Sequence, residues 1–337
     1  MQRTGYLFDR IVAFSNLWRA AHKAWRGKKD KTRIANFYFN LERELLFLQE
    51  ELVTGTYQPR SYHVFEVTDP KRREIAAADF RDRLVHHAII NVLDPVFERR
   101  LIFDTYACRV GKGTHAAVQK VQAFSRRWPF FLKCDIRKYF HSINHTVLKA
   151  LLVRIIKDKR VLDLLECIIT HPVPDHPPGK GIPIGNLTSQ HFANLYLGEM
   201  DHFVKETLRV EGYLRYMDDF LFFGQTKSIL HGIHFEIMQF LHEHLFLMLK
   251  GRVTLLAPVS DGIPFLGFRI FPSTIRIPQK GLARFRRKLH AKESEFHQGK
   301  IDETLLSRSV GSMIGHMAHA DTLAVRQQMF TAVVGLG

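Results

Sequence analysis

The spacing of apolar residues predicts a helix followed by a hairpin in the first part of the chain. Four leucines recur three or four residues apart, as on one face of a helix: Leu41, Leu45, Leu48 and Leu52. Gly55 follows them and is placed to end that helix. Two β-type stretches, 62–67 and 73–76, flank a polar segment at 68–71, which predicts a hairpin with a basic tip. A second helix is expected over 80–94.

From residue 130 the pattern changes. An apolar stretch at 130–136 has the pattern of a buried strand, with Asp135 near its end. The elements expected after it are a helix over about 144–156, a loop over 171–185, a helix over 188–208, strands at 213–216 and 220–224, a helix over about 228–246, a short hairpin around 264–267 and basic helices from 281. Strands and helices do not alternate regularly, so the sequence predicts an α+β fold and not a doubly wound sheet.

Composition and charge narrow the class of protein. With 46% apolar and 24% charged residues among 337, the chain is typical of a globular protein. A net charge of +16 favours a polyanionic partner, most often nucleic acid. The three cysteines, Cys108, Cys134 and Cys167, are too widely spaced to suggest a disulfide framework or a cysteine zinc site. No signal peptide or membrane-spanning stretch is evident, so a cytoplasmic location is expected.

Three acidic residues are candidates for chemistry. Asp218 and Asp219 are adjacent between two apolar strands, where like charges are costly unless a cation neutralises them. Asp135 lies at the end of another apolar strand. If these strand ends lie side by side, the carboxylates converge and can hold two metal ions, as in-line phosphoryl transfer requires. The alternative for an isolated Asp-Asp pair is a solvated turn.

The surrounding motifs resemble those of reverse transcriptases. Tyr216-Met217-Asp218-Asp219 is the tetrapeptide that marks this family, and the resemblance extends from about Tyr57 to Gly267. The matching blocks, in the family's order, are Tyr57-Gln58-Pro59, Arg72 to Ile75 with Arg81 to Val85, Asp135 to Phe140, Gly181 to Gln190, and Phe265-Leu266-Gly267.

This resemblance implies an RNA-directed DNA polymerase, a nucleotidyltransferase, with the right-hand fold of fingers, palm and helical thumb. The expected segments are a basic helical N-terminal part at 1–56, fingers at 57–129, the palm at 130–276 and the thumb at 277–337. The implied cofactor is Mg²⁺ in a two-metal site, with Mn²⁺ as a substitute in vitro. The implied partners are template RNA, the cDNA primer and product, and dNTPs, with no membrane.

Site residues follow from their positions in these blocks. The resemblance assigns catalysis to Asp135, Asp218 and Asp219, and metal binding to the same three residues with Ile136. It assigns dNTP binding to Arg73, Arg83 and Phe140, with Tyr139 as the alternative ring. Template contact and fidelity are assigned to Ile184, Gly185, Ser189 and Gln190, and the primer grip to Phe265, Leu266 and Gly267. Phe140 would be the steric gate that excludes a 2′-hydroxyl. The alternatives are a surface ion pair for either arginine and simple core packing for Phe140.

The template block departs from the usual pattern. Most reverse transcriptases have Gln-Gly and Ser-Pro where this chain has Ile184-Gly185 and Ser189-Gln190. This block is similar to that of the reverse transcriptases of diversity-generating retroelements, which are bacterial, archaeal or phage-encoded. That resemblance implies mutagenic retrohoming: error-prone copying of a template-repeat RNA at adenines, with a small basic accessory protein and scope for an oligomeric assembly. The alternatives are a retron or group II intron-like enzyme of ordinary fidelity, and a non-catalytic RNA-binding protein.

Overall fold

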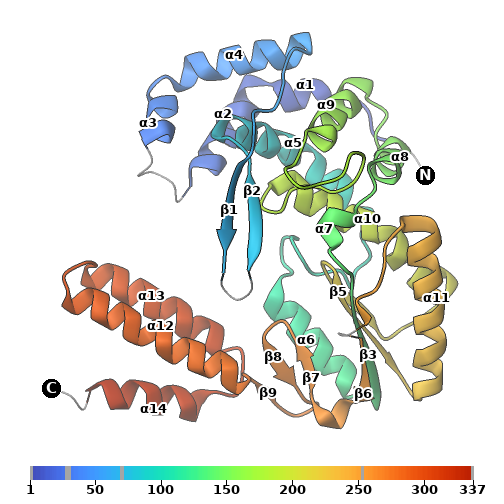
Figure 1. The fold of residues 1–337 in the computed structure, drawn as a ribbon, viewed down its shortest axis with the longest axis vertical. Helices are drawn as coiled ribbons and strands as arrows, with labels where there is room; N and C mark the ends of the chain where they lie inside the picture. Colours follow the sequence, from blue (N-terminus) through green and yellow to red (C-terminus); the bar gives the residue numbers. More distant parts are fainter. Residues whose placement is uncertain (1–2, 27–31, 69–71, 252–253, 335–337) are drawn as a thin grey trace.

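Helices make up the N-terminal part of the chain in the computed structural model, which describes residues 3–26, 32–68, 72–251 and 254–334 (Figure 1). They are α1 (Phe8–Val12), α2 (Phe14–Trp25), α3 (Thr32–Phe39) and α4 (Leu41–Thr54). The predicted leucine helix is confirmed as α4, whose four spaced leucines are all buried. Gly55 ends α4 with a left-handed φ of 74° and donates its N–H back to the last turn.

The predicted hairpin is also present and projects from this helical part (Figure 1). Strands β1 (His63–Val67) and β2 (Arg73–Ala77) are antiparallel, and β1 is exposed along its whole length. Tip residues 69–71 lie outside the described part of the chain. Helix α5 (Phe80–Glu98) follows and is longer than expected, because it continues past Pro95. Its first turn is capped by the Asp79 carboxylate, which accepts a hydrogen bond from the N–H of Arg81 at 3.0 Å.

The central element is a four-stranded antiparallel sheet, called the palm sheet below. Its strand order is β4-β5-β3-β6, with β3 (Phe130–Asp135), β4 (Tyr213–Tyr216), β5 (Asp219–Gly224) and β6 (Leu255–Pro258). The tight turn between β4 and β5 consists of Met217 and Asp218. Asp219 was expected in this turn, but it is the first residue of β5 because it pairs with Asp135 in the sheet.

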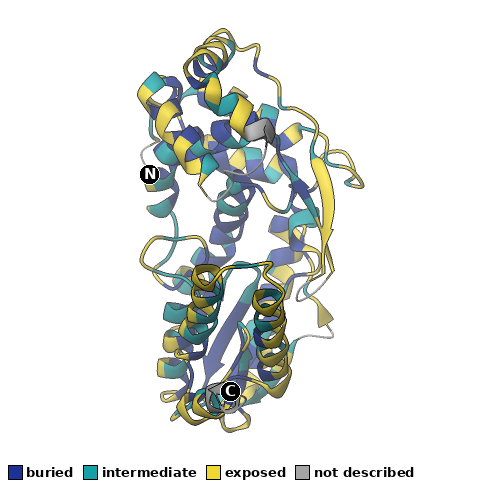
Figure 2. Cartoon of the chain, turned by 90° about the vertical axis from the view of Figure 1, so that its left-hand side faces the viewer, coloured by how far each residue is buried: buried dark blue, intermediate teal, exposed yellow. Residues whose placement is uncertain are grey.

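Both faces of the palm sheet are covered. Side chains alternate along β3, so Leu132 and Cys134 join one apolar cluster, whereas Phe131 joins another on the opposite face. Helices α10 (Leu187–His202) and α11 (Lys227–Leu245) contribute to the first cluster; α6 (Thr114–Ser125) and a small sheet contribute to the second. Strands β3, β4 and β5 are therefore largely buried, whereas the edge strand β6 is partly exposed and β1 of the hairpin is exposed throughout (Figure 2).

Three helices connect β3 to α10. They are α7 (Tyr139–Ser142), α8 (His145–Ile155) and α9 (Lys159–Thr170). The predicted helix over 144–156 is α8, and Asn144 caps it with a side-chain oxygen that accepts two backbone N–H bonds. The predicted helix over 188–208 ends earlier than expected, because the backbone changes to a π-helical turn at Phe203–Thr207.

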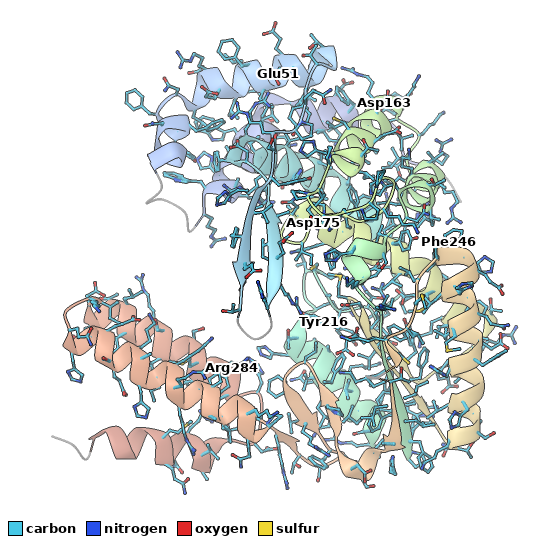
Figure 3. The ribbon with its side chains drawn as sticks, in the orientation of Figure 1. Glu51, Asp163, Asp175, Tyr216, Phe246 and Arg284 are labelled. Carbon is cyan, nitrogen blue, oxygen red and sulfur yellow. The ribbon has the colours of Figure 1, made fainter. Side chains whose placement is uncertain are left out.

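The C-terminal part combines a small sheet with three helices. Its elements are β7 (Ile263–Phe265), β8 (Phe268–Ile270), β9 (Ile275–Arg276), α12 (Gln279–His297), α13 (Glu303–Met317) and α14 (Leu323–Val334). A groove with a volume of about 680 Å³ lies between α12, which carries Arg284 and Arg287, and Thr68, which follows β1 (Figure 3). The predicted α+β class is confirmed. Within the described residues, no helix is long and apolar enough to cross a membrane.

Candidate active site

The structure brings the three predicted carboxylates to one end of the palm sheet. Asp135, the last residue of β3, lies directly opposite Asp219, the first residue of β5. Asp218 precedes it in the turn, where Met217 has a left-handed φ of 56°. A non-glycine residue in this region is strained, and such strain is often found at functional sites.

Burial and mutual repulsion make Asp218 and Asp219 reluctant to ionise. Burial first, and then the charge of Asp135, raise the pKa of Asp218 above its ordinary value. Burial, with smaller contributions from Asp135 and Asp218, raises the pKa of Asp219 to about 6, although Lys133 opposes the shift. The arrangement therefore favours a bound cation, which would remove the repulsion.

Magnesium fits this donor set. The carboxylates are hard oxygen ligands, and Oδ1 of Asp219 is buried without a hydrogen-bond partner among the described residues. In the described part of the chain, no three Asp, Glu, His or Cys side chains are grouped closely enough to hold a metal ion by themselves. Magnesium commonly takes one or two carboxylates and completes its shell with water and substrate phosphates, so Asp135 and Asp218 could hold it.

Two positive charges lie close to Asp218. The charges of Arg73 on the hairpin and of Lys250 both lower the pKa of Asp218. The N–H of Lys250 donates to the carbonyl of Asp135 at 2.9 Å, which brings segment 247–250 alongside the end of β3. The structure thus places Arg73 near Asp218. Lys250 was not identified from the sequence, because no local pattern links it to Asp218.

Arg83 lies in a different environment. Its guanidinium lies over the Phe80 ring, 5.5 Å from the centroid, and its Nε is buried without a hydrogen-bond partner among the described residues. Burial lowers its pKa, and Asp79 opposes the shift. Among the described residues, the charge acting on Arg83 is that of Asp79, whereas Arg73 acts on Asp218, so Arg73 is the better placed of the two predicted arginines.

The two aromatic candidates for the steric gate differ in burial. Tyr139 is fully buried, and its hydroxyl donates to the carbonyl of Ala193 at 2.5 Å. Phe140 is half-buried and packs against the edge of the core. Only Phe140 therefore retains ring surface that a substrate could contact.

The template block joins Phe140 to the hairpin β1–β2. The N–H of Ile182 donates to the carbonyl of Phe140 at 2.9 Å, and the N–H of Ala76 donates to the carbonyl of Ile184 at 3.2 Å. Gly185 has a φ of 113°, and a Cβ there would lie 2.7 Å from a methyl group of Ile75. Only glycine allows the loop to approach the hairpin this closely.

The other residues of the template block face different surroundings. Ile184 is half-buried and Gly185 is exposed, whereas Ser189 is buried at the start of α10. Gln190 is half-buried, and its Oε1 accepts a hydrogen bond from the thiol of Cys108 at 3.3 Å. Ile184 and Gly185 are thus more accessible than Ser189, which supports the block from inside.

The predicted primer grip is the turn of the hairpin β7–β8. Phe265 is paired with Phe268, and both rings are buried. Leu266 and Gly267 form the two-residue turn with φ values of 47° and 87°. These values are typical of the turn that matches the twist of paired strands, although Leu266 is an unusual residue for it.

A buried arginine supports the catalytic turn, and the sequence pattern did not reveal it. Arg215 on β4 is fully buried and donates to both carboxylate oxygens of Asp201, at 2.8 and 2.5 Å. It also donates to the carbonyl of Met217 at 3.0 Å and to Asn194 on α10. Burial alone would lower the pKa of Arg215, but the charge of Asp201 raises it above its ordinary value. Arg215 thus joins α10 to the turn that carries Asp218.

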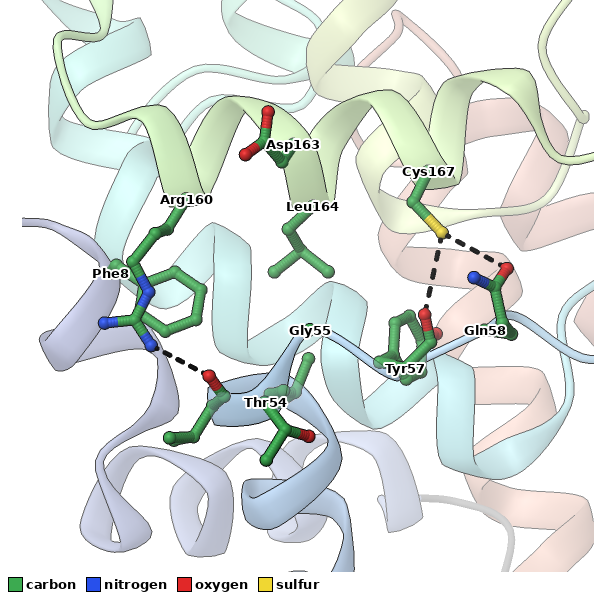
Figure 4. A pocket seen from close by; sticks show the side chains of 11 residues that line it. Phe8, Thr54, Gly55, Tyr57, Gln58, Arg160, Asp163, Leu164 and Cys167 are labelled. Atoms are coloured by element: carbon green, nitrogen blue, oxygen red, sulfur yellow. Dashed lines mark hydrogen bonds between the residues drawn. The ribbon is translucent and has the colours of Figure 1, made fainter.

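A separate cavity lies away from the carboxylates. It has a volume of about 310 Å³ and lies between α9, α1 and the end of α4 (Figure 4). Arg160 covers the ring of Phe8, 3.7 Å from its centroid, and the thiol of Cys167 donates to the carbonyl of Tyr57 at 3.8 Å. The first of the matched blocks therefore lies at this cavity, where Tyr57 and Gln58 line its wall, and away from the carboxylates.

Comparison with known proteins decides the family. The family model for reverse transcriptase (RNA-dependent DNA polymerase) matches residues 68–270, which is more than half of the chain. The chain belongs to the reverse transcriptase family. The matched region begins just after β1 and runs from β2 through the palm sheet to β8. The fold of this reverse transcriptase is the predicted right-hand polymerase fold, of the α+β class.

Its relatives include proteins encoded within introns. The chain is 25% identical to protein YkfC of Escherichia coli over 301 residues, which cover 74% of this chain and 79% of YkfC. It is 26% identical to the group II intron-encoded protein LtrA of Lactococcus lactis over 200 residues, 57% of this chain and only 33% of LtrA. Telomerase from Candida albicans, solved with a fragment of telomeric RNA, aligns with 83% of this chain and 55% of that chain, at 12% identity and a TM-score of 0.49.

Proposed function

We propose that this reverse transcriptase is an active RNA-directed DNA polymerase that uses Mg²⁺ held by Asp135 and Asp218. The observation that carries the proposal is the pairing of β3 with β5, which places Asp135 opposite Asp219 and beside the strained turn at Asp218. When bound, the metal would neutralise charge on the transferring phosphoryl group and lower the pKa of the attacking 3′-hydroxyl. Arg73 would hold the triphosphate, because a guanidinium matches phosphate oxygens.

Primer extension tests this proposal against the other two readings. With a DNA primer, we expect products on an RNA template when Mg²⁺ is present and none when EDTA is added. A non-catalytic RNA-binding protein would give no product on the RNA template, with Mg²⁺ or with EDTA. A retron-like or group II intron-like enzyme would give products with ordinary fidelity.

We further propose that the chain copies a template-repeat RNA within a diversity-generating retroelement and errs mainly at template adenines. The support is Ile184, which is half-buried in the loop bonded to the hairpin β1–β2 and has no side-chain hydrogen-bonding group. The small basic accessory protein implied by the same resemblance belongs to this proposal. We expect it to be needed for long products.

The fidelity prediction is tested by Ile184→Gln. Glutamine would add an amide that can hydrogen-bond near the templating nucleotide, an effect worth about 0.5–1.5 kcal/mol. Errors opposite adenine should therefore fall by up to about tenfold while activity stays measurable. The measurement is sequencing of cDNA made on a defined RNA template. Ile229→Gln, at an exposed position on α11, is the matched control. Errors spread evenly over the four template bases, or an unchanged Ile184→Gln profile, would contradict the proposal.

Sugar selection is tested by Phe140→Ala. Removing the half-buried ring should make room for a 2′-hydroxyl. The use of ribonucleotides relative to deoxyribonucleotides should rise by at least about tenfold, which is within the range of discrimination that the shape of a binding pocket provides. The measurement is the ratio of kcat/KM for a ribonucleotide and its deoxyribonucleotide. Phe235→Ala, at an exposed position on α11, is the control. A shift of this ratio by Tyr139→Ala but not by Phe140→Ala would identify the other ring as the gate.

A further inference from the structure

One lysine connects the catalytic end of the palm sheet to the hairpin β7–β8. The ammonium group of Lys133 on β3 donates to Oδ2 of Asp219 at 2.9 Å and to the carbonyl of Pro264 at 2.9 Å. The side chain of Lys133 is only 15% exposed, and its nitrogen lies 5.7 Å from the centroid of the Phe265 ring. A single buried group therefore contacts both a candidate catalytic carboxylate and the strand that leads to the predicted primer grip.

The strand register explains why Lys133 can reach both partners. Side chains alternate along β3, so Lys133 points to the same face as Phe131, where the sheet β7–β8–β9 packs. Lys133 is opposite Leu221 in the pairing with β5, which makes Asp219 its diagonal neighbour. A buried ammonium group requires hydrogen-bond partners, and these two acceptors supply them.

The remaining support of this hairpin is mostly apolar. Phe265 and Phe268 belong to the buried cluster on that face of the palm sheet. Apolar packing has no preferred direction, so it holds the hairpin against the sheet without defining its position along the strands. The hydrogen bond from Lys133 to Pro264 has a defined length and angle, and it is anchored beside the carboxylates.

We propose that Lys133 is a positioning residue that fixes the hairpin β7–β8 relative to Asp219, and thereby sets where the 3′ end of the primer lies. This inference rests on the proposed polymerase function. Lys133 itself does not contact the reacting atoms; it acts through Asp219 and through the backbone of Pro264. Without it, the turn at Leu266 and Gly267 could shift relative to the carboxylates, and the 3′-hydroxyl would be misplaced for attack.

The link itself is tested by amide hydrogen exchange over residues 263–270. In Lys133→Met, which preserves side-chain length but removes the donor, exchange in this hairpin should be faster than in the wild-type chain. Lys133→Arg retains donors for both acceptors and should keep exchange slow. The matched control is Lys149→Met, which removes the same charge from an exposed pair with Glu166 on α8 and α9. Should Lys133→Met fail to fold, Lys133→Gln gives the same comparison, because its amide is too short to reach both acceptors.

The kinetic consequence is tested by single-turnover extension of a primer on RNA. Lys133→Met should lower the rate of the first nucleotide addition by about 10²-fold, because a misplacement of reacting groups by about 1 Å typically has an effect of this size. The affinity for primer–template and the fraction of active molecules should stay unchanged, since the basic surface is intact. Lys133→Arg should restore most of the rate. A variant that was merely less stable would show fewer active molecules at an unchanged rate.

The outcomes separate this inference from the proposed function. Hairpin exchange in Lys133→Met that equals the wild type would overturn the link. Faster exchange with an unchanged single-turnover rate would overturn the positioning role. A wild-type chain that adds no nucleotide, but whose hairpin exchange still responds to Lys133→Met, would contradict the polymerase proposal and leave the link supported.

Discussion

Asp135→Asn or Asp218→Asn is expected to lower polymerisation by at least about 10³-fold, because each removes a charged metal ligand while preserving side-chain shape. The charge of Asp135, together with burial, raises the pKa of Asp218, so both carboxylates belong to the same site. Affinity for RNA should be retained, since it depends on the net charge of +16 and not on these acids. The measurements are primer extension and, separately, RNA binding.

The matched control is Asp163→Asn. Asp163 is an exposed acid on α9, in the wall of the separate cavity (Figure 4). The Asp163→Asn substitution makes the same chemical change away from the palm sheet and should leave primer extension unaffected. Extension close to the wild-type rate by either Asp135→Asn or Asp218→Asn would refute their assignment as metal ligands.

The second large effect is expected for Arg215→Met. This change leaves Asp201 fully buried without its charged partner, which typically costs about 3–5 kcal/mol. A loss of that size is a large part of the total free energy of unfolding of most proteins. The urea midpoint for unfolding should therefore fall strongly. Arg215 also holds the carbonyl of Met217, so the turn that carries Asp218 should become mobile at concentrations of urea below the midpoint.

A double variant separates the two contributions of Arg215. Arg215→Met with Asp201→Leu removes both buried charges and should recover much of the lost stability, because a buried ion pair is often no better than apolar packing. The rate of polymerisation should be low in both the single and the double variant, since the hydrogen bond to the carbonyl of Met217 is missing in each. A single Arg215→Met variant with a wild-type urea midpoint would show that the buried pair contributes little to stability.

Elements with strong local patterns were predictable from the sequence. The leucine spacing of α4, the hairpin β1–β2 and the strand pair around Asp218 all depend on neighbours close in the chain. Strand β6 was not predicted: it pairs with β3, which lies far away in the sequence, and its own apolar pattern is short. Local periodicity carries no information about such a partner.

Among the site residues, the sequence identified types and order but not environments. Asp135, Asp218 and Asp219 are brought together at one end of the palm sheet, as their positions in the matched blocks implied. The support of the Met217–Asp218 turn by Arg215, through the carbonyl of Met217, was missed, because an arginine within a strand is ordinarily expected at the surface.

The matched blocks also did not indicate which of their residues are exposed and which are buried in the core. Ser189 and Tyr139 are both buried, although the matched blocks place them beside template and nucleotide. Their positions depend on how α10 and α7 pack against the palm sheet, which no short motif specifies. The structure therefore narrows the set of residues able to contact a substrate.

The measurement that tests the polymerase proposal most directly is single-turnover addition of one deoxynucleotide to a DNA primer annealed to RNA. The purified wild-type chain and Asp218→Asn should be compared at the same concentration, with Mg²⁺ and with EDTA. We predict an extended primer only for the wild-type chain with Mg²⁺. Addition by Asp218→Asn at the wild-type rate, or no addition by the wild-type chain while it binds the same primer and template, would contradict the proposal.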